Sequence, residues 1–158
     1  MTGSELRQRF LQHFTSRDHL ELPSASLIPV RDPTTLFNSA GMQPLKPYFQ
    51  GLSQPPAPRL TSAQKCFRTQ DLEEVGKSDR HGTFFEMLGN FAPTGAYFKE
   101  TAIPLAWELV TDGLAMPKDR LRVTIHPTDD EADAHWRSKT DVRPDWIYRQ
   151  EDNWWAAG

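Results

Sequence analysis

Residues 63–91 read AQKCFRTQDLEEVGKSDRHGTFFEMLGNF. Ala63 to Arg68 has the composition of a short strand, and Thr83 to Phe91 is dense in aromatic residues, Met and Leu. Between them, Thr69 to Gly82 carries six charged residues and two glycines. A strand, a long polar loop and a second strand predict an antiparallel hairpin.

Before the hairpin, the chain predicts short elements separated by prolines. Thr2 and Glu5 have the spacing of a capping box, and the apolar positions that follow predict an amphipathic helix ending near Arg17. Leu20 to Leu22 alternates like a short strand. Ser24 to Pro33 contains two prolines, so it is expected to be an edge strand or an extended arm. A turn and then a short helix are expected in the next stretch, residues 38–50.

After the hairpin, a helix is predicted over Glu100 to Thr111, with Pro104 in its first turn and Gly113 as its C-terminal cap. Leu121 to Ile125 alternates as a strand. Thr128 begins a second capping box that opens a helix to about Lys139, and a last strand is expected near residues 146–148.

Strands and helices follow one another without the regular alternation of a doubly wound sheet. The fold class expected is therefore α+β, with an antiparallel β-sheet flanked by helices, in one domain over residues 1–158.

Composition excludes several classes of protein. No apolar run approaches the ~18 residues of a membrane span, and the N-terminus has no hydrophobic signal region. The single cysteine, Cys66, cannot form an internal disulfide, so a reducing cytoplasm is expected. Metal-binding spacings such as Cys-x-x-Cys and His-Glu-x-x-His are absent. Because the net charge is −3, any contact with nucleic acid has to come from a local basic patch.

A nucleotide, if bound, is held by side chains, because the glycine-rich phosphate-binding motifs are absent. Arg68 and Arg80 flank the polar loop, and a guanidinium can bridge two oxygens of a phosphate. Phe84 and Phe85 follow, and an aromatic ring can stack on a base. The alternative is that these are ordinary edge and core residues of a hairpin.

Three other groups allow a functional and a structural interpretation. Asp71 and its acidic neighbours could bind Mg²⁺ or simply be solvated. Cys66 with His81 could form a nucleophile and base, although a packed thiol is the simpler account. Trp155 and the tryptophan before it could line a small pocket or belong to the core.

At the hairpin, residues 64–69, 71–76 and 80–91 resemble the second signature motif of the alanyl-tRNA synthetases. Residues 32–42 resemble the first motif of that family. Shorter matches follow along the whole chain, at residues 97–99, 106–109, 129–132 and 152–155. The resemblance implies a class II aminoacyl-tRNA synthetase fold. It also implies an enzyme that uses ATP and Mg²⁺ to make alanyl-adenylate and then transfers alanine to tRNA(Ala).

The resemblance assigns roles to individual residues. Those assigned to ATP binding are Arg68, Asp71, Arg80, Phe84, Phe85 and Met87. Arg68 matches the catalytic arginine that contacts the α-phosphate, and either Phe84 or Phe85 matches the position that stacks on adenine. The backbone of Met87 is expected near the adenine, and Trp155 matches a wall of the alanine pocket.

The sequence departs from the family at Gly82, where a second histidine is usual, and at residues 92–96. The third motif and the zinc-bearing region have no counterpart in the 158 residues, so zinc is not expected. We therefore expect the N-terminal part of an adenylation domain, inactive alone, whose partners include the rest of a synthetase or another copy of itself. The alternative is a non-catalytic paralog that binds a nucleotide, the tRNA acceptor end or a partner synthetase.

Overall fold

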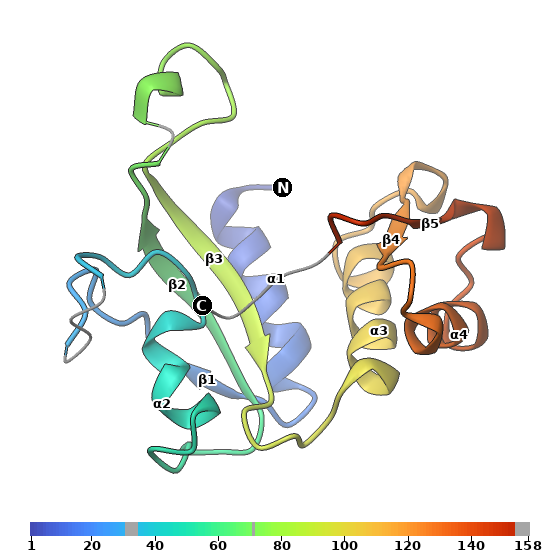
Figure 1. The fold of residues 1–158 in the computed structure, drawn as a ribbon, viewed down its shortest axis with the longest axis horizontal. Coiled ribbons are helices and arrows are strands. Elements are labelled where there is room, and N and C mark those ends of the chain that lie inside the picture. The colour runs from blue at the N-terminus through green and yellow to red at the C-terminus, as the bar shows by residue number, and fades with distance from the viewer. Residues whose placement is uncertain (31–34, 71, 154–158) are drawn as a thin grey trace. The chain divides into compact units, whose positions relative to one another are not determined.

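The computed structural model describes residues 1–30, 35–70 and 72–153 (Figure 1). The chain divides into two compact units, Met1–Ala96 and Tyr97–Gly158. Within the described residues, no helix is both long and apolar enough to cross a bilayer.

The first unit begins with helix α1, Gly3–Thr15. The predicted capping box is confirmed: the Thr2 hydroxyl accepts a hydrogen bond from the Glu5 amide at 3.2 Å, and the Glu5 carboxylate accepts one from the Thr2 amide at 2.6 Å. These two bonds satisfy amide donors that have no partner inside the helix. Phe10 and Phe14 are buried, so α1 packs through its apolar face as the sequence predicts.

The predicted hairpin is confirmed as the centre of a three-stranded sheet. Strand β2, Leu60–Phe67, pairs antiparallel with β3, Phe84–Phe91, and β1, Leu20–Leu22, lies on the other side of β2. The polar loop between β2 and β3 projects beyond the ends of the strands (Figure 1). β1 runs parallel to β2, so this sheet is mixed rather than purely antiparallel. The long connection between β1 and β2 permits the parallel pairing, which a short turn could not form.

β1 pairs only with the first three residues of β2, and irregular backbone covers the rest of that edge. The stretch Ser24–Pro33 forms no strand in its described part, which is consistent with an extended arm. The Gln64 side chain accepts from the Ala25 amide at 2.8 Å and donates to the Ala25 carbonyl at 3.1 Å. Farther along, the Phe67 amide donates to the Asn38 carbonyl at 2.9 Å. The Lys65 amide donates to the Ser24 hydroxyl at 3.0 Å, so the edge amides of Lys65 and Phe67 are satisfied without another strand.

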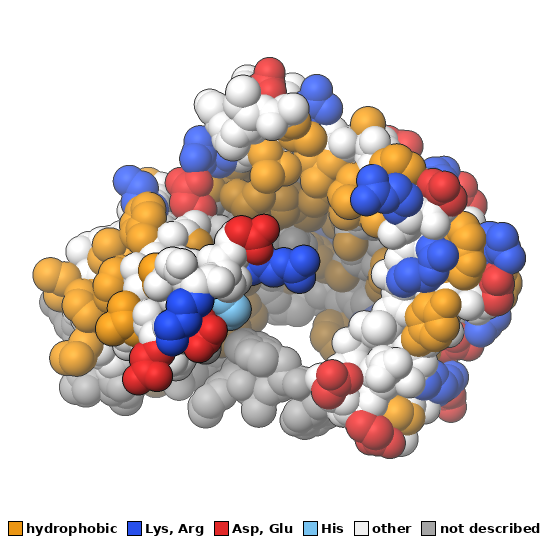
Figure 2. All heavy atoms as spheres, turned by 90° about the horizontal axis from the view of Figure 1, so that it is seen from above, with side chains coloured by type: hydrophobic (Ala, Val, Ile, Leu, Met, Phe, Trp, Pro, Cys, Tyr) orange, Lys and Arg blue, Asp and Glu red, His pale blue; other side chains and the backbone are white. Residues whose placement is uncertain are grey.

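The predicted short helix before the hairpin is also present. It consists of a 3₁₀ turn, Gln43–Leu45, followed directly by α2, Lys46–Phe49. Figure 2 shows apolar side chains gathered on the side of this unit that carries the arm and α2. The exposed large apolar residues of this stretch are Ile28, Val30, Leu36, Phe37, Phe49 and Leu52.

His19 gives the first unit a pH-dependent stability. Its ring is buried, with Nδ1 3.0 Å from the carbonyl oxygens of Phe14 and Arg17, and burial lowers the pKa of His19 below its ordinary value. The unfolded chain therefore takes up a proton near pH 6.5, before the folded chain does. We expect the free energy of unfolding to fall as the pH drops from about 6.5 through the folded pKa. Urea unfolding at pH 7 and 5.5 measures this slope.

The control for that experiment is a second histidine that is exposed. His19→Gln should flatten the dependence on pH, whereas His81→Gln should leave it unchanged. An equal slope in the parent chain and in His19→Gln contradicts the assignment.

The second unit contains α3, Lys99–Glu108, a π-helical turn, Leu109–Gly113, and α4, Asp130–Lys139. A separate two-stranded parallel sheet joins β4, Val123–Ile125, to β5, Ile147–Arg149. The hydrophobic core cluster of the second unit consists of Ile103, Trp107, Val123, Ile125, Ala132 and Val142. The predicted helices and strands of this region are therefore present, with ends shifted by a few residues.

Three local predictions for this unit are wrong in detail. Pro104 is the sixth residue of α3 and lies inside the helix, because the helix begins at Lys99. The left-handed backbone after the π turn belongs to Ala115, with φ 54°, and not to Gly113. The cap of α4 is Asp129, because the Thr128 hydroxyl is hydrogen-bonded to the His126 ring at 2.9 Å.

Asp129 also links α4 to the start of α3. Its Oδ1 accepts from the Ala132 amide at 3.0 Å and from Lys99 Nζ at 2.7 Å. Loss of a cap costs about 0.5–2 kcal/mol, so Asp129→Ala should lower the stability of this unit by about that amount. Thermal unfolding followed by tryptophan fluorescence measures it, since every tryptophan lies in this unit. Asp119→Ala, a surface change without such contacts, should stay within about 0.5 kcal/mol, and equal losses contradict the cap.

Candidate nucleotide site

The register of the hairpin sorts the predicted site residues onto two faces. Cys66 pairs with Phe85 and Phe67 pairs with Phe84. Because successive side chains in a strand point to opposite faces, Phe85 shares its face with Arg68, at the end of β2, and Phe84 lies on the other face. The Arg68 guanidinium carbon lies 5.1 Å from the centre of the Phe85 ring. Arg68 therefore shares a face with one of the two phenylalanines, and the ring is that of Phe85.

Arg68 is exposed and is held by neutral groups. Its Nε donates to the Ser39 carbonyl at 2.8 Å, and its amide donates to the Thr83 carbonyl at 2.8 Å. Within the described part of the chain, no carboxylate forms a salt bridge with Arg68. The nearest candidate on β3, Glu86, is paired with Arg7 at 2.6 Å. The positive charge is thus positioned by neutral groups, and no described carboxylate compensates it, which suits a phosphate-binding group.

Met87 continues this face beyond Phe85, and the segment before α2 lies against it. The Gly41 amide donates to the Met87 sulfur at 3.1 Å. A Cβ on Gly41 would lie 3.5 Å from both the Met87 side chain and the Phe91 ring. A Cβ on Gly89 would lie only 2.4 Å from Phe91, so the absence of a side chain at Gly89 makes room for that ring. Phe91 therefore closes the far end of the face.

Ser39, Gly41 and Phe91 were assigned no role from the sequence, although all three lie in the stretches that match the family motifs. They contact the predicted site residues through backbone groups or through a ring. Contacts of this kind cannot be predicted from composition or from residue spacing. Their positions within the matched motifs are the signal that could have found them.

Other predicted site residues are not brought to this face. Arg80 lies in the projecting loop, where its Nε lies 3.9 Å from a carboxylate oxygen of its neighbour Asp79. Phe84 is 54% exposed on the opposite face. Asp71 and Trp155 lie outside the described residues, so their placement is not described.

Cys66 does not form a nucleophile–base pair with His81. Its side chain is fully buried and donates to the Gln64 carbonyl at 3.4 Å, and burial raises the pKa of the Cys66 thiol. His81 is exposed in the loop, where its Nδ1 lies 3.0 Å from the Ser78 hydroxyl. The packed-thiol interpretation of Cys66 is therefore the correct one.

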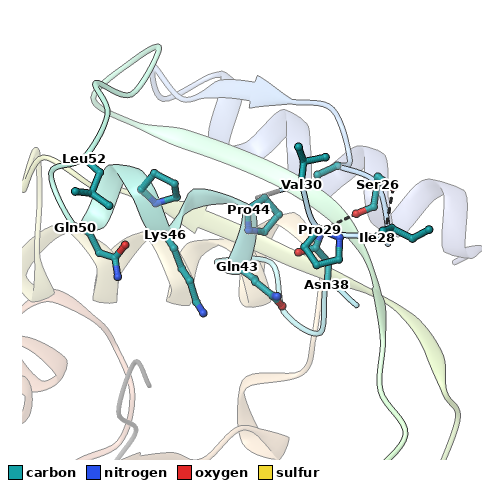
Figure 3. Close-up of a pocket in the computed structure, with 12 residues that line it drawn as sticks. Ser26, Ile28, Pro29, Val30, Asn38, Gln43, Pro44, Lys46, Gln50 and Leu52 are labelled. Atoms are coloured by element: carbon teal, nitrogen blue, oxygen red, sulfur yellow. Dashed lines mark hydrogen bonds between the residues drawn. The ribbon is translucent and has the colours of Figure 1, made fainter. Parts of the chain in front are cut away.

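A separate cavity of about 470 Å³ lies between the arm and the helical turn that leads into α2 (Figure 3). Aliphatic and proline side chains line much of it, and the Gln43, Lys46 and Gln50 side chains are its longer polar members. Arg68, Phe85 and Met87 do not line it. The cavity is therefore distinct from the face that carries Arg68.

Comparison with known proteins defines the class. Residues 5–158 match the family model described as tRNA synthetases class II (A). The match covers all but the first four residues, and the chain belongs to this family. The mixed helix and strand content, with a central sheet flanked by a helix, agrees with the fold that the resemblance implies.

Three curated relatives with more than 50% identity are alanine–tRNA ligases. The chain is 57% identical over 157 residues to the alanine–tRNA ligase of Desulfitobacterium hafniense, a match that covers 99% of the chain. It is 54% identical to that of Acetivibrio thermocellus and 52% identical to that of Caldicellulosiruptor saccharolyticus, over 98% and 100% of the chain. In each case the match spans 18% of the relative's length.

Proposed function

We propose that this chain supplies the nucleotide-binding part of the alanine-activating site of an alanine–tRNA ligase. The proposed reaction joins alanine to AMP at the expense of ATP and then transfers the alanyl group to tRNA(Ala), in the cytoplasm. One observation carries the proposal for the site: an exposed arginine that forms no salt bridge with any described carboxylate lies over an aromatic ring on a paired strand. The identity to alanine–tRNA ligases supports the choice of amino acid.

The proposed role of Arg68 is electrostatic. The alanine carboxylate oxygen attacks the α-phosphorus, a new acyl–phosphate bond forms, and the bond to the leaving pyrophosphate breaks. Negative charge gathers on the α-phosphate oxygens in the transition state. A guanidinium held against the α-phosphate in the ATP-bound state stabilises that charge more than it stabilises the ground state.

The proposed role of Phe85 is to stack on adenine, and that of Met87 is to place its backbone beside the base. The common face of Arg68, Phe85 and Met87 supports this choice, and the opposite placement of Phe84 argues against Phe84. When ATP binds, the Arg68 guanidinium moves from the ring to the phosphate, and the ring becomes available to the base. Positioning then supplies much of the remaining rate, since no covalent enzyme intermediate is needed.

The other assignments stay proposals that rest on the family alone. They are Asp71 and Arg80 at the ATP phosphates or the tRNA acceptor end, and Trp155 at the alanine pocket. Over the described ranges, no three His, Cys, Asp or Glu side chains are grouped to hold a metal ion. We therefore assign no residue to Mg²⁺, which is proposed to enter bound to the phosphates of ATP.

Titration of the ¹⁵N-labelled chain with Mg·ATP tests the proposed site. An exposed charged contact contributes little in water, and a base stack adds ~1–3 kcal/mol, so we expect a dissociation constant near ~1 mM. Amide shifts should centre on Arg68, Phe85 and Met87, and Arg68→Ala should weaken binding and remove the shifts around position 68. The absence of shifts at these residues at ~10 mM ATP, tenfold above the expected constant, contradicts the proposed site.

A further inference from the structure

Arg7 of α1 forms a two-pronged ion pair with Glu86 of β3. Its Nε donates to the two carboxylate oxygens at 3.2 and 3.0 Å, and a terminal nitrogen donates to Oε2 at 2.6 Å. The two residues are 79 positions apart in the chain. Such fork-to-carboxylate geometry fixes the direction of both side chains, which a single contact does not.

Glu86 sits between the two residues of β3 that the proposed site uses. Its chain neighbours are Phe85 and Met87, and the alternation of the strand puts their side chains on the face opposite to Glu86. A shift or rotation of β3 at Glu86 therefore moves both Phe85 and Met87 relative to Arg68 on β2. The ion pair with Arg7 therefore holds β3 at the residue that lies between Phe85 and Met87.

Helix α1 provides a firm anchor for this pair. Arg7 lies one turn before Phe10 and two turns before Phe14, and both aromatic side chains are buried. The first turn of the helix is held by the capping box at Thr2 and Glu5. The position of Arg7 is thus set at both ends of the helix rather than by the pair itself.

Glu86 has a second possible partner on the neighbouring strand. Lys65 lies directly opposite Glu86 in the β2–β3 register, where opposite charges normally attract. The carboxylate is instead hydrogen-bonded to Arg7. The Arg7 and Glu86 side chains are 38% and 29% exposed, and pairs this open to solvent contribute little to stability. Geometry, rather than stability, is the property that this contact supplies.

We infer that Arg7 is a positioning residue of the nucleotide site, which it reaches through Glu86, and this inference rests on the function proposed for Arg68, Phe85 and Met87. The helix side of the sheet thereby sets the geometry of the opposite, ligand-binding side. A lysine at position 7 keeps the charge but cannot form the fork. It is therefore expected to fail as a substitute.

The test compares four variants of the whole chain: Arg7→Ala, Arg7→Lys, the double exchange Arg7→Glu with Glu86→Arg, and Gln8→Ala as the control on the same helix. The first readout needs no ligand and is the amide hydrogen exchange of Phe85 and Met87. It should accelerate in Arg7→Ala and Arg7→Lys, and it should recover at least in part in the double exchange. Gln8→Ala should match the parent chain.

The second readout is the dissociation constant of ATP. It should rise about fivefold in Arg7→Ala and Arg7→Lys, within the range of indirect couplings, and recover with the double exchange. Unchanged amide exchange at Phe85 and Met87 in Arg7→Ala overturns the inference. Faster amide exchange that is confined to α1 also overturns it. If the parent chain binds no ATP, the proposed function fails, and the ligand-free exchange still decides whether Arg7 positions β3.

Discussion

Replacing Arg68 by alanine is expected to lower alanine-dependent ATP–pyrophosphate exchange by about 10²–10³-fold, the usual effect of removing one preorganised donor to a developing charge. The experiment uses a chimaera in which residues 1–158 replace the matching stretch of the Desulfitobacterium alanine–tRNA ligase, to which they are 57% identical. The loss should appear mainly in kcat, because the charge on the α-phosphate is greatest in the transition state. Thermal stability should hardly change, since the Arg68 side chain is exposed and its described contacts are one backbone oxygen and the face of the Phe85 ring.

Two control variants separate the role of Arg68 from the general effect of removing an arginine. Arg137→Ala removes an exposed arginine paired with Asp133 in the second unit, and it should leave exchange within about twofold of the parent chimaera. Arg68→Lys keeps the charge without the fork and should fall between the parent and Arg68→Ala. An Arg68→Ala chimaera within about fivefold of its parent contradicts the role of Arg68. A folded but inactive parent chimaera favours the non-catalytic paralog instead.

The hairpin could be predicted from sequence because its signals are local. A polar loop between two apolar runs defines two strands and their antiparallel direction, whatever the rest of the chain does. The choice between Phe84 and Phe85 could not be made in the same way. It depends on whether Phe84 or Phe85 stands opposite Cys66, and a loop of this length does not fix that register.

The contacts that complete the site come from distant segments. Arg7 reaches Glu86, and the Ser39 carbonyl reaches Arg68, across stretches of chain that carry no shared periodicity. The parallel pairing of β1 depends in the same way on where the long connection returns. Composition predicts that a residue is charged or apolar, but which of several suitable partners it meets is decided by the packing of the whole unit.

The largest effect on stability is expected from Phe14→Ala in α1. The Phe14 side chain is 2% exposed, and its ring centre lies 4.9 Å from that of Phe10, 5.0 Å from His13 and 5.1 Å from His19. Removing a buried phenylalanine side chain costs about 3–5 kcal/mol, because transfer energy is lost and a cavity remains. In a unit of this size each kcal/mol lowers the Tm by roughly 4–8 °C, so a fall of more than about 12 °C is expected.

The measurement has to follow the first unit, which contains no tryptophan. Amide signals of β2 and β3 during urea unfolding report it directly, and Leu36→Ala, at a side chain 84% exposed, serves as the control with little expected change. Because α1 also carries Arg7, the loss of Phe14 should accelerate exchange at Phe85 and Met87 as well. A Phe14→Ala variant as stable as Leu36→Ala contradicts the packing of α1 against the sheet. If Phe14→Ala lowers stability but leaves amide exchange at Phe85 and Met87 unchanged, the packing of Phe14 supports the stability of the unit without positioning its site.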